Sequence, residues 1–128
     1  MIVVDSSAIV AVLFDEPGAD QIAQKLVSSE CVMSAATRVE LGIVIEAKAG
    51  APATLLLEEL LERVELRLVA VDELTVRESI LAWRRFGKGR HRAALNFGDV
   101  FAYALAVQLG VPLLCVGDDF AHTDVELA

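Results

Sequence analysis

The chain opens with residues 1–8, MIVVDSSA, and the order of residue types in this stretch indicates the fold. The β-branched run at 2–4 predicts a short buried strand. Asp5 and the two serines after it have side chains that cap helices, and the apolar residues 8–14 predict a helix that begins there. A strand that leads through an acidic turn directly into a helix is typical of α/β proteins.

The same alternation continues along the chain. Three further strands are expected from apolar runs, at 31–33, 66–71 and 111–116. Between them, helical patterns separated by Gly or Pro breaks such as Gly50-Ala51-Pro52 predict helices around 22–27, 39–45, 55–64, 73–86 and 98–109. Because short strands alternate with helices, we predict an α/β fold with a central, mostly parallel sheet.

Size and composition are those of one domain. The 128 residues, 55% of them hydrophobic, suffice for one core, so we expect a single domain over 1–128. The apolar runs are too short to cross a bilayer, and residues 1–4 lack the basic region of a signal peptide. We therefore expect no membrane association and a cytoplasmic location. Cys31 and Cys115 lie in apolar stretches and are expected to be unpaired and buried.

The net charge of −8 argues against a general nucleic-acid binder, because affinity for phosphates comes from Lys and Arg. The positive charge is concentrated, however, and no Asp or Glu falls between residues 84 and 98. Five of the eleven Lys and Arg residues form this basic segment, namely Arg84, Arg85, Lys88, Arg90 and Arg92. It is either a solvated loop or a surface for phosphates.

Acidic residues lie just past the ends of predicted strands. Asp5 follows the first strand, Asp118 and Asp119 follow the last, and Glu40 lies early in the helix after the second. Asp99 begins the helix before the last strand and is placed on the same side by inference. Ligands of such sheets bind outside the carboxyl ends of the strands, so these residues predict a common site.

Each carboxylate also has a local interpretation. Asp5 can cap the first helix, Asp99 can complement a helix dipole, Asp118 can belong to a turn, and Thr37 with Glu40 matches a capping box. These interpretations do not explain why all of the acids fall on one side of the sheet.

A group of neighbouring carboxylates is costly unless a cation is bound, because the negative charges repel one another. The absence of His and Cys from the group favours Mg²⁺, or Mn²⁺, over zinc. A carboxylate-held Mg²⁺ with bound waters suits hydrolysis of a phosphodiester. The basic segment just before Asp99 would then hold the phosphates of the substrate.

Four segments have a recognisable pattern: MIVVDSSA at 1–8, VELG at 39–42, GKGRHRAALNFGDVFAYALA at 87–106, and GDDF at 117–120 followed by Thr123-Asp124. Together they resemble PIN domains, specifically the VapC-type toxins of bacterial toxin–antitoxin pairs. The resemblance implies a three-layer α/β/α sandwich whose central, mostly parallel sheet has four to five strands. It also implies a metal-dependent endoribonuclease of a type II toxin–antitoxin system. Such an enzyme cuts structured RNA, often tRNA, to leave a 3′-hydroxyl and a 5′-phosphate.

Further expectations follow from this resemblance. Asp5 and Asp99 would be the principal metal ligands, and Glu40 would complete the set by binding metal directly or through water, or by helping to activate the nucleophile. Asp118 would be the fourth acidic residue, with Asp119 as its rival. Val116 stands where the family often has Thr or Lys, so a hydrogen bond near Asp118 is expected to be missing. The protein would be a homodimer silenced by a VapB-type antitoxin.

Two other functions remain open on the sequence alone. One is a phospho-acceptor or phosphatase domain with Asp5 as nucleophile, although Ser7 stands where a haloacid-dehalogenase-type phosphatase has its second Asp. The other is a non-catalytic, partner-binding PIN-like module.

Several side chains are expected to have structural roles. We interpret His91 as a loop residue, and Ser6 and Ser7 as helix caps or supports for Asp5. Three aromatic residues at helical spacing are expected in the core rather than stacked on RNA, namely Trp83, Phe86 and Phe97.

Overall fold

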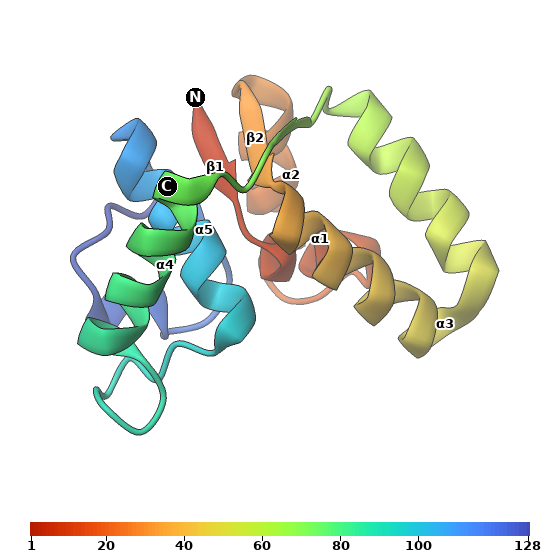
Figure 1. The fold of residues 1–128 in the computed structure, drawn as a ribbon. Coiled ribbons are helices and arrows are strands. Elements are labelled where there is room, and N and C mark those ends of the chain that lie inside the picture. The colour runs from red at the N-terminus through yellow and green to blue at the C-terminus, as the bar shows by residue number, and fades with distance from the viewer.

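The computed structural model describes all 128 residues and contains four strands, five α-helices and one 3₁₀ helix. Figure 1 shows their arrangement. The elements in chain order are β1 (Ile2–Val4), α1 (Ser6–Leu13), α2 (Ala19–Ser28), β2 (Cys31–Ser34), α3 (Ala35–Arg63), β3 (Arg67–Val69), α4 (Glu73–Phe86), α5 (Phe97–Leu109), β4 (Leu113–Leu114) and η1 (Phe120–His122).

The strands form one parallel sheet in the order β3-β2-β1-β4. In the centre, Val3 pairs with Val32 of β2 on one side and with Leu113 of β4 on the other. This topology confirms the predicted α/β fold with a central parallel sheet. Because all strands run the same way, their carboxyl ends lie along one edge, where β1 leads into α1 and β2 into α3.

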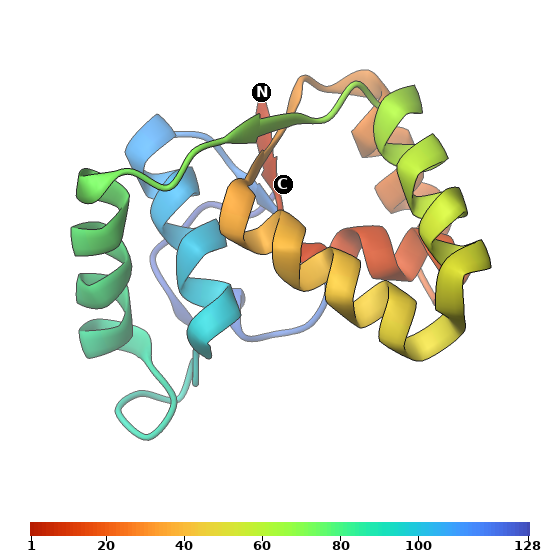
Figure 2. The ribbon, with the colours of Figure 1, turned by 45° about the vertical axis from the view of Figure 1, so that its right-hand side comes forward.

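Alternate residues of the central strands enter two separate cores. Val4 and Met33 pack into one core together with residues of α1, α2 and α3, whereas Val3 and Val32 pack into the other with residues of α4 and α5. The strict alternation follows from the two-residue period of a strand. The sheet is therefore covered on both faces, and Figures 1 and 2 show the two groups of helices on opposite sides of it. The fold is the expected three-layer sandwich.

Helix α3 differs from the prediction of two separate helices, although the turn between them lies where expected. The helix is assigned over Ala35–Arg63, but Gly50 inside it has φ 75° and ψ −173°, and Pro52 follows. Glycine adopts this backbone conformation without penalty, and proline suits the first turn of a new helix. The chain consequently reverses, and the second half of α3 returns beside α1 and α2 (Figure 2). Leu57 and Leu61 of this half are buried in the first core.

The predicted burial of Trp83, Phe86 and Phe97 is only partly correct. Phe86 is buried in the second core, as expected, but the prediction is wrong for Trp83 and Phe97, which are 42% and 82% exposed. Both lie on outer faces of α4 and α5, because helical spacing alone does not say which face meets the sheet. Cys31 is buried and Cys115 half-buried, and neither forms a disulfide, as predicted. None of the helices combines the length and apolar character needed to cross a membrane.

Candidate active site

The acidic residues predicted from the sequence come from separate elements that meet at the carboxyl edge of the sheet. Asp5 directly follows β1, Glu40 lies in the second turn of α3, and Asp99 lies in the first turn of α5. The charges of Asp5 and Glu40 both raise the pKa of Asp99, so the three carboxylates lie within electrostatic range of one another. The structure therefore brings together residues 35 to 94 positions apart in sequence.

Hydrogen bonds hold Asp5 between the ends of β1 and β4. It is only 4% exposed, and its Oδ2 accepts hydrogen bonds from the backbone N–H of Ser7 at 3.1 Å and from Ser7 Oγ at 2.6 Å. The same Ser7 Oγ accepts from the backbone N–H of Val116 at 3.0 Å, just after β4. Asp5 is thus the residue that caps α1, and Ser7 supports the Asp5 carboxylate, as predicted. Val116 donates this hydrogen bond through its backbone N–H, so the bond does not depend on the identity of the Val116 side chain.

Burial raises the pKa of Asp5 because the charged form loses contact with water, and the charge of Asp119 raises it further. The hydrogen bonds from Ser6 and Ser7 act in the opposite direction, since they stabilise the carboxylate. Asp5 therefore caps helix α1, while its burial disfavours the charged form of its carboxyl group.

Glu40 has no part in the capping box that Thr37 and Glu40 match in sequence. Helix α3 begins one turn earlier, with Ser34 as its N-cap and the Ser34 side chain accepting from the backbone N–H of Ala36. Glu40 Oε1 instead accepts a hydrogen bond from Ser6 Oγ at 3.1 Å, across 34 residues. The local interpretation of Glu40 is thus wrong, and its side chain faces the site.

Asp99 forms a capping box with Asn96 at the start of α5. Asn96 Oδ1 accepts from the Asp99 backbone N–H and Asp99 Oδ2 accepts from the Asn96 backbone N–H, both at 2.9 Å. Burial raises the pKa of Asp99 to about 6, with smaller contributions from the charges of Asp5, Asp119 and Glu40. Asp99 therefore takes part in a local capping box and also lies within electrostatic range of the other acidic residues.

Of the two aspartates after β4, Asp119 acts on the cluster. Its charge raises the pKa of Asp5, of Asp99 and of the neighbouring Cys115 thiol, whereas Asp118 contributes to none of these. Both residues are exposed in the turn before η1. Strand-end position alone favoured Asp118, but the direction in which each side chain leaves a tight turn depends on the folded backbone.

The carboxylates fit a hydrated metal ion rather than one enclosed by protein. No three His, Cys, Asp or Glu side chains are close enough together to surround an ion as they stand. Mg²⁺ keeps several of its waters and is usually held by one or two carboxylates, so a loose group of oxygen ligands suits it. A structural zinc ion needs four close N or S ligands, which this group does not offer.

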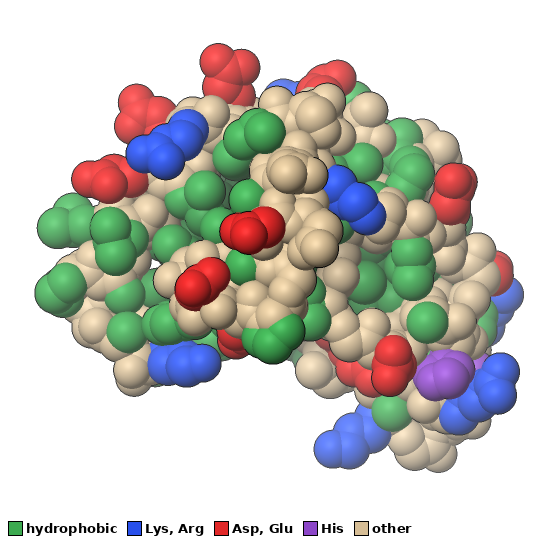
Figure 3. Space-filling view, turned by 180° about the vertical axis from the view of Figure 1, so that it is seen from behind, with side chains coloured by type: hydrophobic (Ala, Val, Ile, Leu, Met, Phe, Trp, Pro, Cys, Tyr) green, Lys and Arg blue, Asp and Glu red, His purple; other side chains and the backbone are tan.

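The basic segment forms the end of α4 and the loop that leads to α5. All five of its Lys and Arg residues are exposed, and Figure 3 shows blue side chains gathered with a His at the lower right, where this loop projects. Arg85 donates to Asp124 at 3.1 Å, and the Arg90 guanidinium lies 4.5 Å from the centre of the Trp83 ring. His91 Nδ1 accepts from the Ala93 backbone N–H, which agrees with its predicted role in the loop.

Residues 2–126 of the chain match the PIN domain family. The chain is 48% identical to a ribonuclease VapC of Mycolicibacterium smegmatis over 125 residues, which is 96% of each chain. Its fold is similar to that of a Mycobacterium tuberculosis VapC toxin described as cleaving the sarcin–ricin loop (TM-score 0.80, 14% identity, 100% and 98% of the two chains). It is also similar to a chain of a toxin–antitoxin complex from Klebsiella pneumoniae (TM-score 0.72, 12% identity, 100% and 97%).

The chain therefore belongs to the PIN domain family and, within it, to the VapC ribonucleases. This result confirms the predicted family, fold and enzyme class, a metal-dependent endoribonuclease that is the toxin of a toxin–antitoxin pair.

Sequence reasoning named Ser6 and Ser7 as possible supports for Asp5 but missed their contacts with distant elements. The contact of Ser6 with Glu40 and the bridge from Ser7 to Val116 both join elements distant in sequence. The only early signal was the pair of hydroxyls directly after Asp5, which also reads as ordinary helix-cap chemistry.

Proposed function

We propose that the protein is a Mg²⁺-dependent endoribonuclease toxin that acts in the cytoplasm as a single domain on structured RNA, with tRNA as the first class to test. The observation that carries this proposal is the meeting of Asp5, Glu40 and Asp99 at the carboxyl edge of the sheet, where burial and mutual repulsion raise the pKa of Asp99 to about 6. Such a group is stabilised by a divalent cation, and Mn²⁺ would serve in place of Mg²⁺.

In this proposal Asp5 and Asp99 bind the metal directly. Asp5 accepts from the backbone N–H and the hydroxyl of Ser7, and Asp99 accepts from the backbone N–H of Asn96, so both carboxylates are oriented before the ion arrives. When bound, the metal would activate a water and neutralise charge that develops on the phosphate. Glu40, held by Ser6, would orient that water or accept its proton.

We assign the fourth acidic position to Asp119 rather than Asp118. The support is electrostatic, since the charge of Asp119 raises the pKa of both Asp5 and Asp99. Asp119 is exposed at the rim of the site, where it would act on the metal through water.

We propose that the basic segment holds the substrate backbone. The loop from Gly87 to Asn96 leads directly into α5, so its cations lie on the chain just before Asp99. Arg85 is partly occupied by Asp124, whereas Arg84 and Arg92 form no ion pair within the chain. Exposed cations beside an acidic metal site would confine the attraction for RNA to one edge of an otherwise acidic protein.

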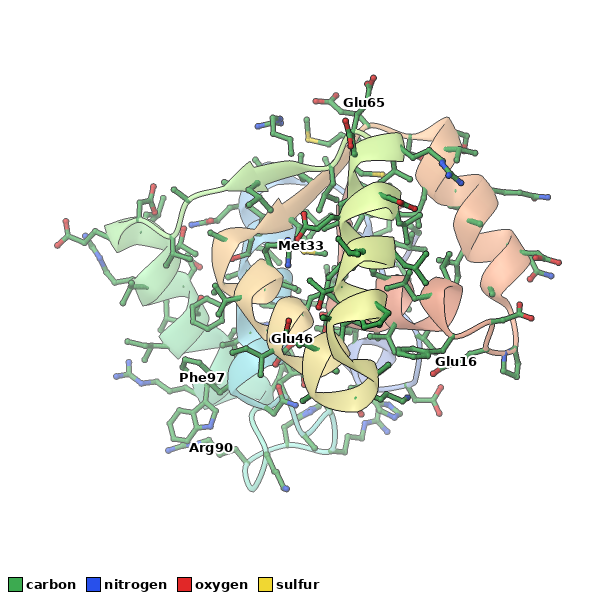
Figure 4. All side chains as sticks on the ribbon, turned by 90° about the vertical axis from the view of Figure 1, so that its right-hand side faces the viewer. Glu16, Met33, Glu46, Glu65, Arg90 and Phe97 are labelled. Atoms are coloured by element: carbon green, nitrogen blue, oxygen red, sulfur yellow. The ribbon has the colours of Figure 1, made fainter.

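The homodimer is proposed to form through the outer face of α4 and α5. An apolar groove of about 690 Å³ lies between these helices, lined by Val76, Ile80, Trp83, Phe97 and Phe101 among others. Figure 4 shows Phe97 and Arg90 projecting from this side of the molecule. Large exposed aromatic side chains on a soluble domain mark a protein interface, and a second copy of the chain provides an equally apolar partner.

A separate apolar surface is proposed to bind a VapB-type antitoxin. Leu13 and Phe14 at the end of α1 and Pro52, Ala53 and Leu56 in the second half of α3 line a groove of about 190 Å³. It lies on the other group of helices and so remains free when α4 and α5 are covered. A helical segment with apolar residues on one face would fit between these helices.

The test is a cleavage assay on total RNA with purified protein, in Mg²⁺ and in EDTA. We expect specific cuts that leave a 5′-phosphate, that stop in EDTA, and that disappear in Asp5→Asn and Asp99→Asn. Sequencing of the cut ends would distinguish tRNA from ribosomal RNA. Cleavage that survives in both variants, after a contaminating nuclease has been excluded, would contradict the proposed site. An inactive wild-type protein that binds no Mg²⁺ or Mn²⁺ would instead favour a partner-binding module.

A further inference from the structure

The start of α5 lies directly against the carboxylate of Glu40. Gly98, the second residue of α5, is buried. A methyl group at this position would lie 1.8 Å from Glu40 Oε2, 2.6 Å from its Cδ and 2.8 Å from Oε1. Ordinary contact begins at about 3.4 Å. The Glu40 carboxylate therefore occupies space that is open only because residue 98 has no side chain.

The backbone itself does not require glycine here. Gly98 is not among the residues with positive φ, so alanine would fit its helical conformation. Inside a helix, alanine is also favoured over glycine. The three atoms nearest to such a methyl group all belong to the Glu40 carboxyl group, and none belongs to the apolar core. The close approach of Glu40 is thus the physical reason for glycine at this position.

Glu40 is held from two sides. Its Oε1 accepts the hydrogen bond from Ser6 Oγ at 3.1 Å, while its Oε2 rests against Gly98. Ser6 follows Asp5 in the chain, and Gly98 precedes Asp99. The two residues that define the position of the Glu40 carboxylate are therefore the immediate neighbours of the two proposed metal ligands.

We infer that Gly98 is a positioning residue of the ribonuclease site, whose missing side chain lets the Glu40 carboxylate come within reach of Asp99. This inference rests on the proposed function. In Gly98→Ala, Glu40 Oε2 must move by about 1.6 Å to regain ordinary contact, and displacements of this size cost roughly 10²-fold in rate. The displaced group is the end of a flexible side chain, so the fold should tolerate the change.

The experiment compares Gly98→Ala with Gly42→Ala, a helical glycine in α3 whose added methyl would meet only the flexible end of Arg38, at 3.0 Å. We expect Gly98→Ala to unfold at the same denaturant concentration as wild type or a higher one, and to lose roughly 10²-fold in kcat with little change in KM. Gly42→Ala should retain wild-type activity.

Second variants separate positioning from a general effect on structure. In a Glu40→Ala background, Gly98→Ala should have no further effect on kcat, because both changes remove the contribution of a correctly placed Glu40 carboxylate. In a Glu40→Asp background, whose side chain is one methylene shorter, Gly98→Ala should likewise cost little. A titration with Mn²⁺ should also show weaker binding to Gly98→Ala than to Gly42→Ala.

The inference is overturned if Gly98→Ala is as active as wild type, or if its loss of activity adds fully to that of Glu40→Ala. A crystal structure of Gly98→Ala with the Glu40 carboxylate unmoved would overturn it as well. These outcomes differ from failure of the proposed function, in which the wild-type protein cuts no RNA or Asp99→Asn still cuts it.

Discussion

Asp99 should destabilise the metal-free protein at neutral pH, and Asp99→Asn should relieve this cost. The folded-state pKa of Asp99 is about 6, against 3.8 for the unperturbed group. A carboxyl group with a raised pKa binds its proton more tightly in the folded state, so ionisation opposes folding. The cost is absent below about pH 4, grows as the pH rises towards 6, and is fully present above that.

The size of the effect follows from the difference between the two pKa values. About two units correspond to roughly 3 kcal/mol at neutral pH. This value is an upper limit, because Asp99 is half-buried and water screens part of its charge. Asparagine can still accept the hydrogen bond from the Asn96 backbone N–H, so the capping box should survive the substitution. We therefore expect the inactive variant to be more stable than the active protein when no metal is bound.

The assay is urea unfolding of wild type and Asp99→Asn in EDTA, at about pH 4 and about pH 7. The two proteins should be equally stable at the lower pH, and the variant should be more stable at the higher one. Millimolar Mg²⁺ should stabilise wild type more than the variant. Asp118→Asn is the matched control and should leave the stability of the site unchanged. The reasoning is refuted if Asp99→Asn is the less stable protein at pH 7 in EDTA, or if the difference does not depend on pH.

Three further predictions concern other parts of the molecule. Ser7→Ala removes a hydrogen bond that lowers the pKa of Asp5, so the acid limb of the pH–rate profile should move to higher pH. The same substitution should lower the free energy of unfolding by about 1 kcal/mol. An unmoved acid limb would contradict the role of Ser7. Phe97→Asp should fold normally, because Phe97 is 82% exposed, but should elute as a monomer in size-exclusion chromatography with light scattering; a dimer would exclude the α5 face as the interface. Arg92→Gln should raise KM and lower the slope of log affinity for RNA against log salt by about 1. Arg67→Gln, on β3 and paired with Glu30, should leave that slope unchanged.

The local sequence was sufficient to predict the alternation of strands and helices and most of the acidic residues that meet at the carboxyl edge of the sheet. Helix caps, glycine breaks and hydrophobic periodicity depend on residues within one turn of each other, so they can be read along the chain. Asp5 and Asp99 could be predicted because each lies at the end of such an element. The reversal at Gly50 was predicted for the same reason.

Only the tertiary structure decided how these groups are used. Position in the sequence favoured Asp118, whereas in the folded protein it is the charge of Asp119 that raises the pKa of Asp5 and of Asp99. The matching pattern of a capping box at Thr37 and Glu40 was overridden when Ser34 began the helix and Ser6 bound Glu40. Periodicity likewise led to the wrong prediction that Phe97 is in the core, whereas it faces outward. Each of these outcomes depends on the packing of elements far apart in sequence, whereas the position of Asp5 after a strand and of Asp99 at the start of a helix could be predicted from the sequence itself.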